Sequence, residues 1–208
     1  MSHGTTDIDA LMRMAPVIPV LAIGDVAHAL PIANALVAGG LPVLEVTLRT
    51  PAALDVILAM RQVPGAIVGA GTVLNKDQLD DALDAGAEFV VSPGLTRKLG
   101  KAARKAGVPF LPGVASAGDI MRGLDLGFDR FKFFPAEAAG GVGALKALTG
   151  PFGDVRFCPT GGITQATAPA WLALSGVLCV GGSWMVPAGP PDPAAIEAAA
   201  RAAKALCA

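Results

Sequence analysis

The chain has 208 residues, which is enough for one large domain or two small ones. Charged residues make up 16% of it, the net charge is −1 at pH 7, and no basic cluster occurs, so neither nucleic acid nor an anionic membrane is expected as a partner. The apolar share of 53% is typical of a parallel α/β protein, whose strands are buried on both faces. The three cysteines are widely spaced and odd in number, which predicts reduced thiols and a cytoplasmic protein.

Helical and strand-like segments alternate along the chain. A first helix is predicted over residues 7–14, and apolar strand-like runs then recur at a spacing of roughly 20–26 residues, about one strand, one helix and two loops. The eight runs begin near Val17, Val43, Ala66, Glu88, Val108, Arg130, Val155 and Val177. Helices are predicted between them over residues 27–38, 52–61, 76–85, 97–106, 119–124, 142–148 and 167–174, and a last helix over 193–206.

Eight near-equal βα periods predict a (β/α)8 TIM barrel with an extra N-terminal helix and a C-terminal helix. The alternative is a doubly wound open sheet, but that fold usually has fewer strands and would not repeat eight times. No linker or change in composition divides the chain, so a single domain is expected over residues 1–208.

The sixth predicted strand carries a lysine among apolar residues. Lys132 lies between Phe131 and Phe133, and Phe134 and Pro135 follow. Apolar surroundings disfavour the ammonium form, and a lysine amine that is partly neutral near pH 7 can attack a carbonyl carbon, as Schiff-base enzymes do. The simpler interpretation is a lysine that extends past its apolar neighbours to reach water.

The second predicted strand carries a carboxylate and a guanidinium on one face. Active sites of (β/α)8 barrels lie at the C-terminal ends of the strands, and strand side chains alternate between the interior and the helices. Over residues 43–49 the even-numbered positions are apolar, so Glu45, Thr47 and Arg49 are expected to point into the barrel. Glu45 is then a candidate general acid and base, and Arg49 a candidate clamp for a carboxylate. A buried structural ion pair is the alternative.

Small residues end two further strands. Thr72 follows Gly69-Ala70-Gly71, so its hydroxyl can donate to an oxyanion where the glycines let a ligand approach the backbone. A tight turn capped by threonine explains this segment equally well. Pro93 lies in a second small-residue segment, residues 92–96, at the end of the fourth strand.

The last two predicted strands end in glycine pairs, at Thr160-Gly161-Gly162 and Gly181-Gly182-Ser183. The loops after strands seven and eight commonly bind phosphate in this fold. Neither loop contains lysine or arginine, so the donors would be backbone amides and the two hydroxyls. Turn formation alone is the commoner reason for a glycine pair.

Missing residue types limit the possible chemistry. The only histidines are His3, near the N-terminus, and His28, in the first helix after a strand, so no histidine-rich group is predicted that could hold a catalytic zinc. The chain has no tyrosine, which excludes a phenolic acid or base. Cys158 has no histidine to activate it and is expected to be a small core residue.

Six segments in this order resemble the 2-keto-3-deoxy-6-phosphogluconate aldolase family, the class I aldolases of the Entner–Doudoroff pathway. They are residues 44–50, 68–74, 92–96, 131–137, 156–163 and 181–184. The similarity runs from about Pro16 to Pro187, whereas Pro190–Ala208 matches only loosely. The loop over residues 138–141 lacks an asparagine that many members have.

The resemblance implies a carbon–carbon lyase that cleaves 2-dehydro-3-deoxy-6-phosphogluconate into pyruvate and glyceraldehyde 3-phosphate, often acts on 4-hydroxy-2-oxoglutarate as well, and needs no metal or other cofactor. It implies a homotrimer, with Lys132 as the Schiff-base residue and Glu45 as the group that moves protons. Further residues would hold the pyruvate part of the substrate: Arg49, Thr72, Pro93 and Phe134. The phosphate end would be Thr160, Gly161, Gly162, Gly181, Gly182 and Ser183.

Two other functions fit parts of the sequence. A phosphosugar isomerase or synthase on the same barrel would use the same phosphate loops, with Lys132 acting only as a charge. A barrel that binds a phosphorylated metabolite for sensing would not need Glu45. A pyruvate-derived adduct trapped on Lys132 by borohydride distinguishes the aldolase from both.

Overall fold

The computed structural model describes residues 7–207, and the side chains of residues 7–206. Its strands are β1 (Val17–Leu21), β2 (Val43–Thr47), β3 (Ile67–Gly71), β4 (Val90–Val91), β5 (Phe110–Leu111), β6 (Gly113–Val114), β7 (Arg130–Phe133), β8 (Arg156–Pro159) and β9 (Val180–Gly182). Its helices are α1 (Ile8–Arg13), α2 (Ala29–Ala38), α3 (Ala53–Met60), α4 (Lys76–Asp84), α5 (Arg97–Ala106), α6 (Ala117–Asp125), α7 (Gly141–Thr149), α8 (Ala168–Leu172) and α9 (Pro193–Lys204), with 3₁₀ turns at Val26–His28 and Ala205–Cys207.

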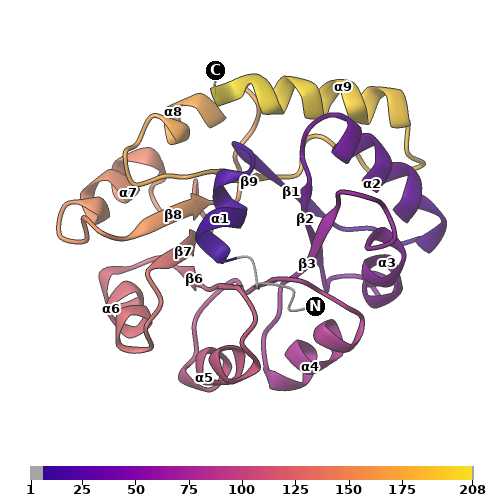
Figure 1. Cartoon of the computed structure of the whole chain (residues 1–208). Coiled ribbons are helices and arrows are strands. Elements are labelled where there is room, and N and C mark those ends of the chain that lie inside the picture. The colour runs from indigo at the N-terminus through magenta and orange to yellow at the C-terminus, as the bar shows by residue number, and fades with distance from the viewer. Residues whose placement is uncertain (1–6, 208) are drawn as a thin grey trace.

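The strands run parallel and form a barrel surrounded by the helices (Figure 1). One sheet has the order β5-β4-β3-β2-β1-β9 and the other β6-β7-β8. Single bridges from Phe157 to Val177 and from Thr160 to Gly181 connect β8 to the segment of β9. At the other junction Pro112, which has no N–H, divides the fifth strand into β5 and β6. The predicted (β/α)8 barrel is confirmed, with this one division.

Strand side chains alternate between two separate cores. Outward residues such as Leu44, Val46 and Phe131 join the large core between the barrel and the helices. Inward residues form a second cluster inside the barrel that includes Ile18, Val43, Phe89, Val91, Leu111 and Cys158. The cysteine is 2% exposed, as expected for a core residue. Above this cluster, toward the C-terminal ends of β2 and β7, the interior contains the buried polar side chains of Glu45, Thr47 and Lys132.

The N-terminal helix α1 closes the lower end of the barrel. Figure 1 shows it across the centre of the ring of strands. Its Leu11 and Met12 are fully buried in the interior cluster. Asp9 forms ion pairs with Arg13 on the same helix and with Arg130, the first residue of β7. The helix thereby limits the access of water to the barrel interior at the N-terminal ends of the strands.

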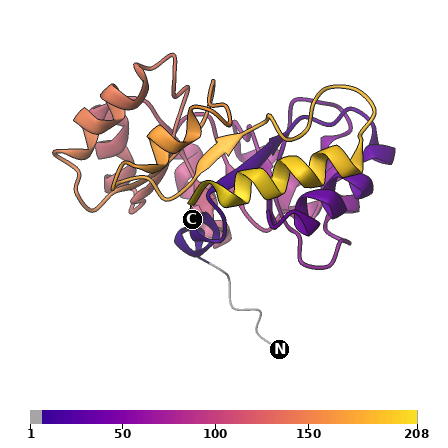
Figure 2. The ribbon, with the colours of Figure 1, turned by 90° about the horizontal axis from the view of Figure 1, so that it is seen from above.

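The C-terminal helix α9 packs along α2 on the outside of the barrel, as Figure 2 shows from above. Gly39, at the end of α2, allows this approach, because a Cβ there would lie 2.3 Å from the Cβ of Ala200. Within residues 7–207, no helix is long and apolar enough to cross a membrane.

The attachment of α1 should depend on pH through Asp9. Hydrogen bonds from Arg13 and Arg130 hold the pKa of this carboxyl below its ordinary value, against the opposing effect of burial. A carboxyl whose pKa is lower in the folded than in the unfolded state stabilises the fold above its unfolded pKa of about 3.9, and this contribution is lost as the pH falls through the folded pKa.

We therefore predict that Asp9→Asn lowers the free energy of unfolding at pH 7 by no more than about 1 kcal/mol, because the pair is partly hydrated. The difference from the unsubstituted chain should shrink as the pH falls below about 4. Chemical denaturation at a series of pH values measures it. Asp129→Asn is the matched control, since Asp129 pairs with the same Arg130 but its side chain is 63% exposed. A pH-independent difference for Asp9→Asn would contradict the prediction.

Candidate active site

Lys132 points into the barrel and is 5% exposed. Its strand neighbours Phe131 and Phe133 point the opposite way, into the core beneath the helices. These two phenylalanines, which are next to Lys132 in the sequence, therefore do not surround its amine. The interior of the barrel buries it instead, and Phe134 is the nearby aromatic residue, with Nζ 5.4 Å from its ring centre.

Glu45 meets Lys132 across the interior of the barrel. The amine Nζ donates to Oε1 of Glu45 at 3.0 Å, and the two side chains are 6% and 3% exposed. Gly71, which pairs with Thr47 on the neighbouring strand, makes this possible, because a Cβ at position 71 would lie 2.2 Å from Oε1. The glycine was expected to admit a ligand, and in the structure it also provides the space that the carboxylate occupies.

A cavity of about 230 Å³ opens above this pair at the C-terminal ends of the strands. Apart from Glu45, which reaches the cavity through its contact with Lys132, every predicted site residue lines it. These are Lys132, Arg49, Thr72, Pro93, Phe134, Thr160, Gly161, Gly162, Gly181, Gly182 and Ser183. Val20, Thr47 and Ile163 complete the lining. Residues from both sheets therefore converge on one small space.

Arg49 lies just beyond the end of β2 rather than on the strand. The ladder ends at Thr47, and the chain then turns, with the amide of Arg49 donating to the carbonyl of Thr47 at 2.7 Å. The side chain is exposed at the mouth of the cavity, and its Nε donates to Oγ1 of Thr47 at 3.0 Å.

Thr72 has a strained backbone, with a φ of 62° in the left-handed region that β-branched residues rarely adopt. Hydrogen bonds on both sides hold it there, since Gly71 O accepts from Leu48 N at 2.8 Å and Val73 N donates to Val91 O at 3.2 Å. Strain of this kind costs of the order of 1–3 kcal/mol and clusters at functional sites. In this backbone conformation Thr72 forms part of the cavity wall.

The segment after β8 offers unpaired amides to the cavity. Gly161 and Gly162 have φ of 107° and 79°, which only glycine adopts readily. Within residues 7–207, the amides of Gly162 and Ile163 donate to no protein group. Gly181 leaves room for the hydroxyl of Thr160, because a Cβ at position 181 would lie 2.3 Å from Oγ1. The cavity therefore has an amide-rich end suited to an anion.

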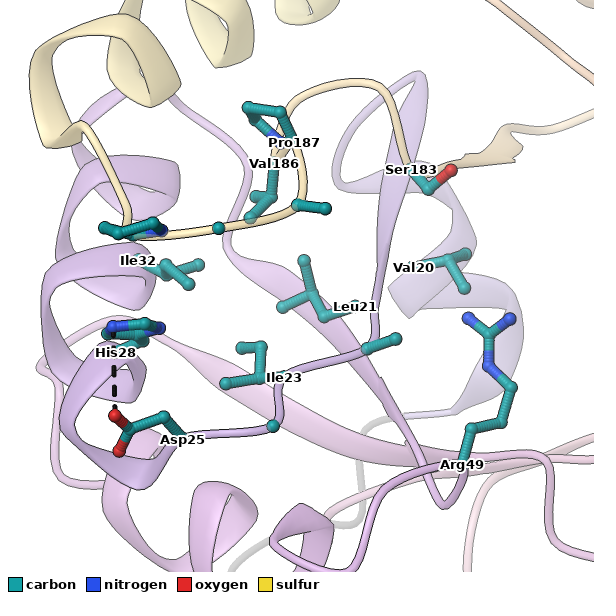
Figure 3. A pocket seen from close by; sticks show the side chains of 15 residues that line it. Val20, Leu21, Ile23, Asp25, His28, Ile32, Arg49, Ser183, Val186 and Pro187 are labelled. Carbon is teal, nitrogen blue, oxygen red and sulfur yellow. Dashed lines mark ion pairs between the residues drawn. The ribbon is translucent and has the colours of Figure 1, made fainter.

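A second, wider cavity of about 680 Å³ adjoins the first and shares Val20, Arg49 and Ser183 with it. Figure 3 shows the guanidinium of Arg49 directed toward Val20 and Ser183. On the opposite side His28, in a 3₁₀ turn, lies 3.9 Å from a carboxylate oxygen of Asp25.

The carboxylate of Glu137, which follows β7, accepts from the indole N–H of Trp171 at 3.2 Å. His3 lies outside the described residues. Within residues 7–207, no three or more histidine, cysteine, aspartate and glutamate side chains gather in a group that could hold a metal ion.

Comparison with known families identifies the family of the chain. A model of the KDPG and KHG aldolase family matches residues 8–199, which is most of the chain. The chain belongs to this aldolase family. The resemblance inferred from the six sequence segments is thereby confirmed.

Relatives of this aldolase are similar over almost their whole length. The 2-dehydro-3-deoxy-phosphogluconate aldolase of Zymomonas mobilis is 64% identical over 200 residues, which cover 96% of each chain. A crystal structure of the 2-keto-3-deoxy-6-phosphogluconate aldolase of Zymomonas mobilis ZM4 with 3-phosphoglycerate has a TM-score of 0.95 and 62% identity, covering 98% of this chain and 97% of that one. A crystal structure of the Legionella pneumophila KDPG aldolase, with pyruvate captured at low pH as a covalent carbinolamine, has a TM-score of 0.86, 46% identity and 97% coverage of both chains.

Sequence reasoning about this aldolase overlooked two features of the site. Thr47 was placed on the inward face of β2 but given no role, although it contacts Arg49. The left-handed backbone of Thr72 carries no sequence signal, because a threonine after two glycines is equally compatible with an ordinary turn. Both features depend on neighbours from other strands.

We predict that Gly71→Ala displaces the carboxylate of Glu45 and lowers kcat by about tenfold or more, because proton transfer depends on the position of the acid or base. The added methyl meets the end of a flexible side chain, so the fold should be retained. Steady-state cleavage rates and thermal unfolding measure the two effects.

Gly143→Ala is the control, since nothing lies within 4 Å of a Cβ at that position on α7. In a Glu45→Gln background, Gly71→Ala should have little further effect on the rate. A full tenfold loss in that background would show that the methyl acts on something other than Glu45.

Proposed function

We propose that this chain is a class I aldolase that cleaves 2-dehydro-3-deoxy-6-phosphogluconate to pyruvate and glyceraldehyde 3-phosphate, and that it also accepts 4-hydroxy-2-oxoglutarate. The observation that carries the proposal is the 3.0 Å contact between the amine of Lys132 and the carboxylate of Glu45 beside a small cavity. This pair supplies a nucleophile and a proton carrier at one place. The covalent carbinolamine in the Legionella enzyme supports the same chemistry.

The first half of the reaction forms the imine. Lys132, as the neutral amine, attacks the C2 carbonyl carbon, and the carbonyl oxygen takes a proton to give the carbinolamine. Glu45 carries protons between nitrogen and oxygen, so that the hydroxyl leaves as water and an iminium remains. The barrel interior is closed below by α1, which limits the access of bulk water to this pair.

The second half breaks the C3–C4 bond. The iminium withdraws the bonding electrons into an enamine, while Glu45, directly or through a water molecule, takes the proton of the C4 hydroxyl and the aldehyde is released. The enamine is then protonated at C3, and water hydrolyses the resulting pyruvate iminium to regenerate Lys132. Each proton taken up by Glu45 is returned within one turnover, so no net acid or base is consumed.

The two ends of the cavity suit the two anionic groups of the substrate. We assign the carboxylate to Arg49 and Thr72, with Pro93 and Phe134 as apolar walls beside the pyruvate methyl. We assign the phosphate to the amides and hydroxyls of the loops after β8 and β9, formed by Thr160, Gly161, Gly162, Gly181, Gly182 and Ser183. The unpaired amides after β8 support this orientation. The 3-phosphoglycerate in the Zymomonas structure supports a phosphorylated ligand.

We also propose that residues 1–208 form one domain that assembles as a homotrimer in the cytoplasm. The family resemblance supports the trimer, and the reduced cysteines expected from the sequence support the compartment. Sedimentation equilibrium of the purified chain measures the assembly, and a monomer or dimer at micromolar concentration would contradict it.

Lys132→Met should abolish turnover and the pyruvate-derived adduct that borohydride traps, because methionine cannot form an imine. This substitution leaves the buried Glu45 without its cation, which is destabilising. Lys132→Arg is therefore the companion variant, since it retains a positive charge but cannot form the imine under these conditions. Mass spectrometry of the trapped protein and cleavage assays provide the measurements.

Lys146→Met, on the exposed surface of α7, is the matched control and should retain both the adduct and the activity. Cleavage by either folded Lys132 variant within about tenfold of the unsubstituted rate would reject the covalent role of Lys132. It would favour a non-covalent reaction on the same barrel.

A further inference from the structure

The side chain of Arg49 is held at one end only. Nε donates to Oγ1 of Thr47 at 3.0 Å. Within residues 7–207, no protein group accepts from the two terminal nitrogens. Figure 3 shows these nitrogens directed toward Val20 and Ser183, which line both cavities, as Arg49 itself does. The fork of donors is therefore presented to the cavity while the stem is fixed.

Thr47 is held more firmly than the arginine it contacts. It is 2% exposed, and its Oγ1 donates to the carbonyl of Leu21, the last residue of β1, at 2.7 Å. A hydroxyl has one proton, and this bond uses it. Since a guanidinium has donors but no acceptor, the lone pairs that remain on Oγ1 are matched to Nε of Arg49. The carbonyl of Leu21 thus sets the direction of the Thr47 hydroxyl. The hydroxyl in turn sets the position of Arg49.

We propose that Thr47 is a positioning residue that orients Arg49 for the carboxylate of the substrate. The inference rests on the proposed function, which assigns Arg49 to that carboxylate. An exposed arginine samples many rotamers, and the entropy lost when one is selected counts against binding. Fixing Nε before the substrate arrives reduces this loss and leaves the terminal nitrogens for the anion.

The test is Thr47→Val, which keeps the branched shape and removes the hydroxyl. KM for the phosphorylated substrate, and the pyruvate concentration that gives half-maximal borohydride trapping, should each rise about three- to tenfold. The kcat should change by less than about twofold, because the carboxylate is bound equally in the ground and transition states. Thr47→Ser keeps the hydroxyl and should restore both values, and it remains informative if the valine variant folds poorly.

Thr50→Val is the matched control. Oγ1 of Thr50 also donates to a carbonyl after β1, that of Ile23, at 2.6 Å, but no hydrogen bond joins it to Arg49. Its KM should stay within about twofold of the unsubstituted value. An equal rise in KM for Thr50→Val, or a parallel fall in kcat for Thr47→Val, would mean that these hydroxyls only support the fold, and it would overturn the proposal.

A double variant tests whether Thr47 acts through Arg49. Arg49→Leu should raise the half-saturating pyruvate concentration by about ten- to hundredfold, and adding Thr47→Val should change it by less than about twofold further. A full additional effect would overturn the positioning role.

The same measurements separate this inference from the proposed function. If the unsubstituted chain gives no pyruvate adduct on Lys132, the aldolase assignment fails. If the adduct forms but Arg49→Leu and Thr47→Val bind pyruvate normally, only the roles of Arg49 and Thr47 are overturned.

Discussion

The ion pair between Lys132 and Glu45 is the interaction on which the site depends. Removing a carboxylate and an ammonium from water costs several kcal/mol for each group, and a close contact only partly offsets this cost. Such a pair adds little to stability, so the apolar cores must provide the stability of the barrel. In return, the pair keeps a nucleophile and a proton carrier 3.0 Å apart without bulk water between them. A proton moved from one group to the other changes the reactivity of both.

Small residues beside this pair show how the barrel accommodates large polar side chains in a narrow interior. Gly71 leaves the space that the Glu45 carboxylate fills, and Gly181 leaves space for the hydroxyl of Thr160. Gly113 behaves similarly, since a Cβ there would lie 2.2 Å from the backbone of Pro93. Glycines on the parallel strands thus determine how closely neighbouring groups approach. Because glycine has no side chain, these positions make room for the packing of the site as well as for a ligand.

The sequence predicted the barrel because its pattern is local. Strands buried on both faces, glycine-marked helix ends and near-equal periods depend on residues close together in the chain. The site was predictable in part, because strand alternation places Glu45 inward and the fold places active sites at the strand ends. Lys132 was identified on its phenylalanine neighbours, two of which face away from it. Its burial results from β2 and from the rest of the interior, far away in the sequence.

Other features of the site could not be predicted because they depend on contacts between strands. The left-handed backbone of Thr72 is held by hydrogen bonds to residues 48 and 91. The contact of Thr47 with Arg49 exists only because β2 ends at position 47 and the chain turns. Neither the end of the ladder nor the turn has a sequence signal as clear as the alternation that precedes it.

The two ends of the cavity differ in the kind of donor they provide, and this difference can orient the substrate. One end has the cationic guanidinium of Arg49, whereas the segment after β8 has the neutral amides of Gly162 and Ile163. On the proposed assignment, the planar carboxylate matches the fork of the guanidinium, and the phosphate matches the converging amides. A lysine or arginine at the amide end would also attract the carboxylate and permit the reversed orientation. The reactive C2 carbon is bonded to the carboxylate carbon, so on the proposed assignment the contact with Arg49 also positions C2 for Lys132. On that assignment, the absence of a cation from the loops after β8 and β9 favours this orientation of the substrate over the reversed one.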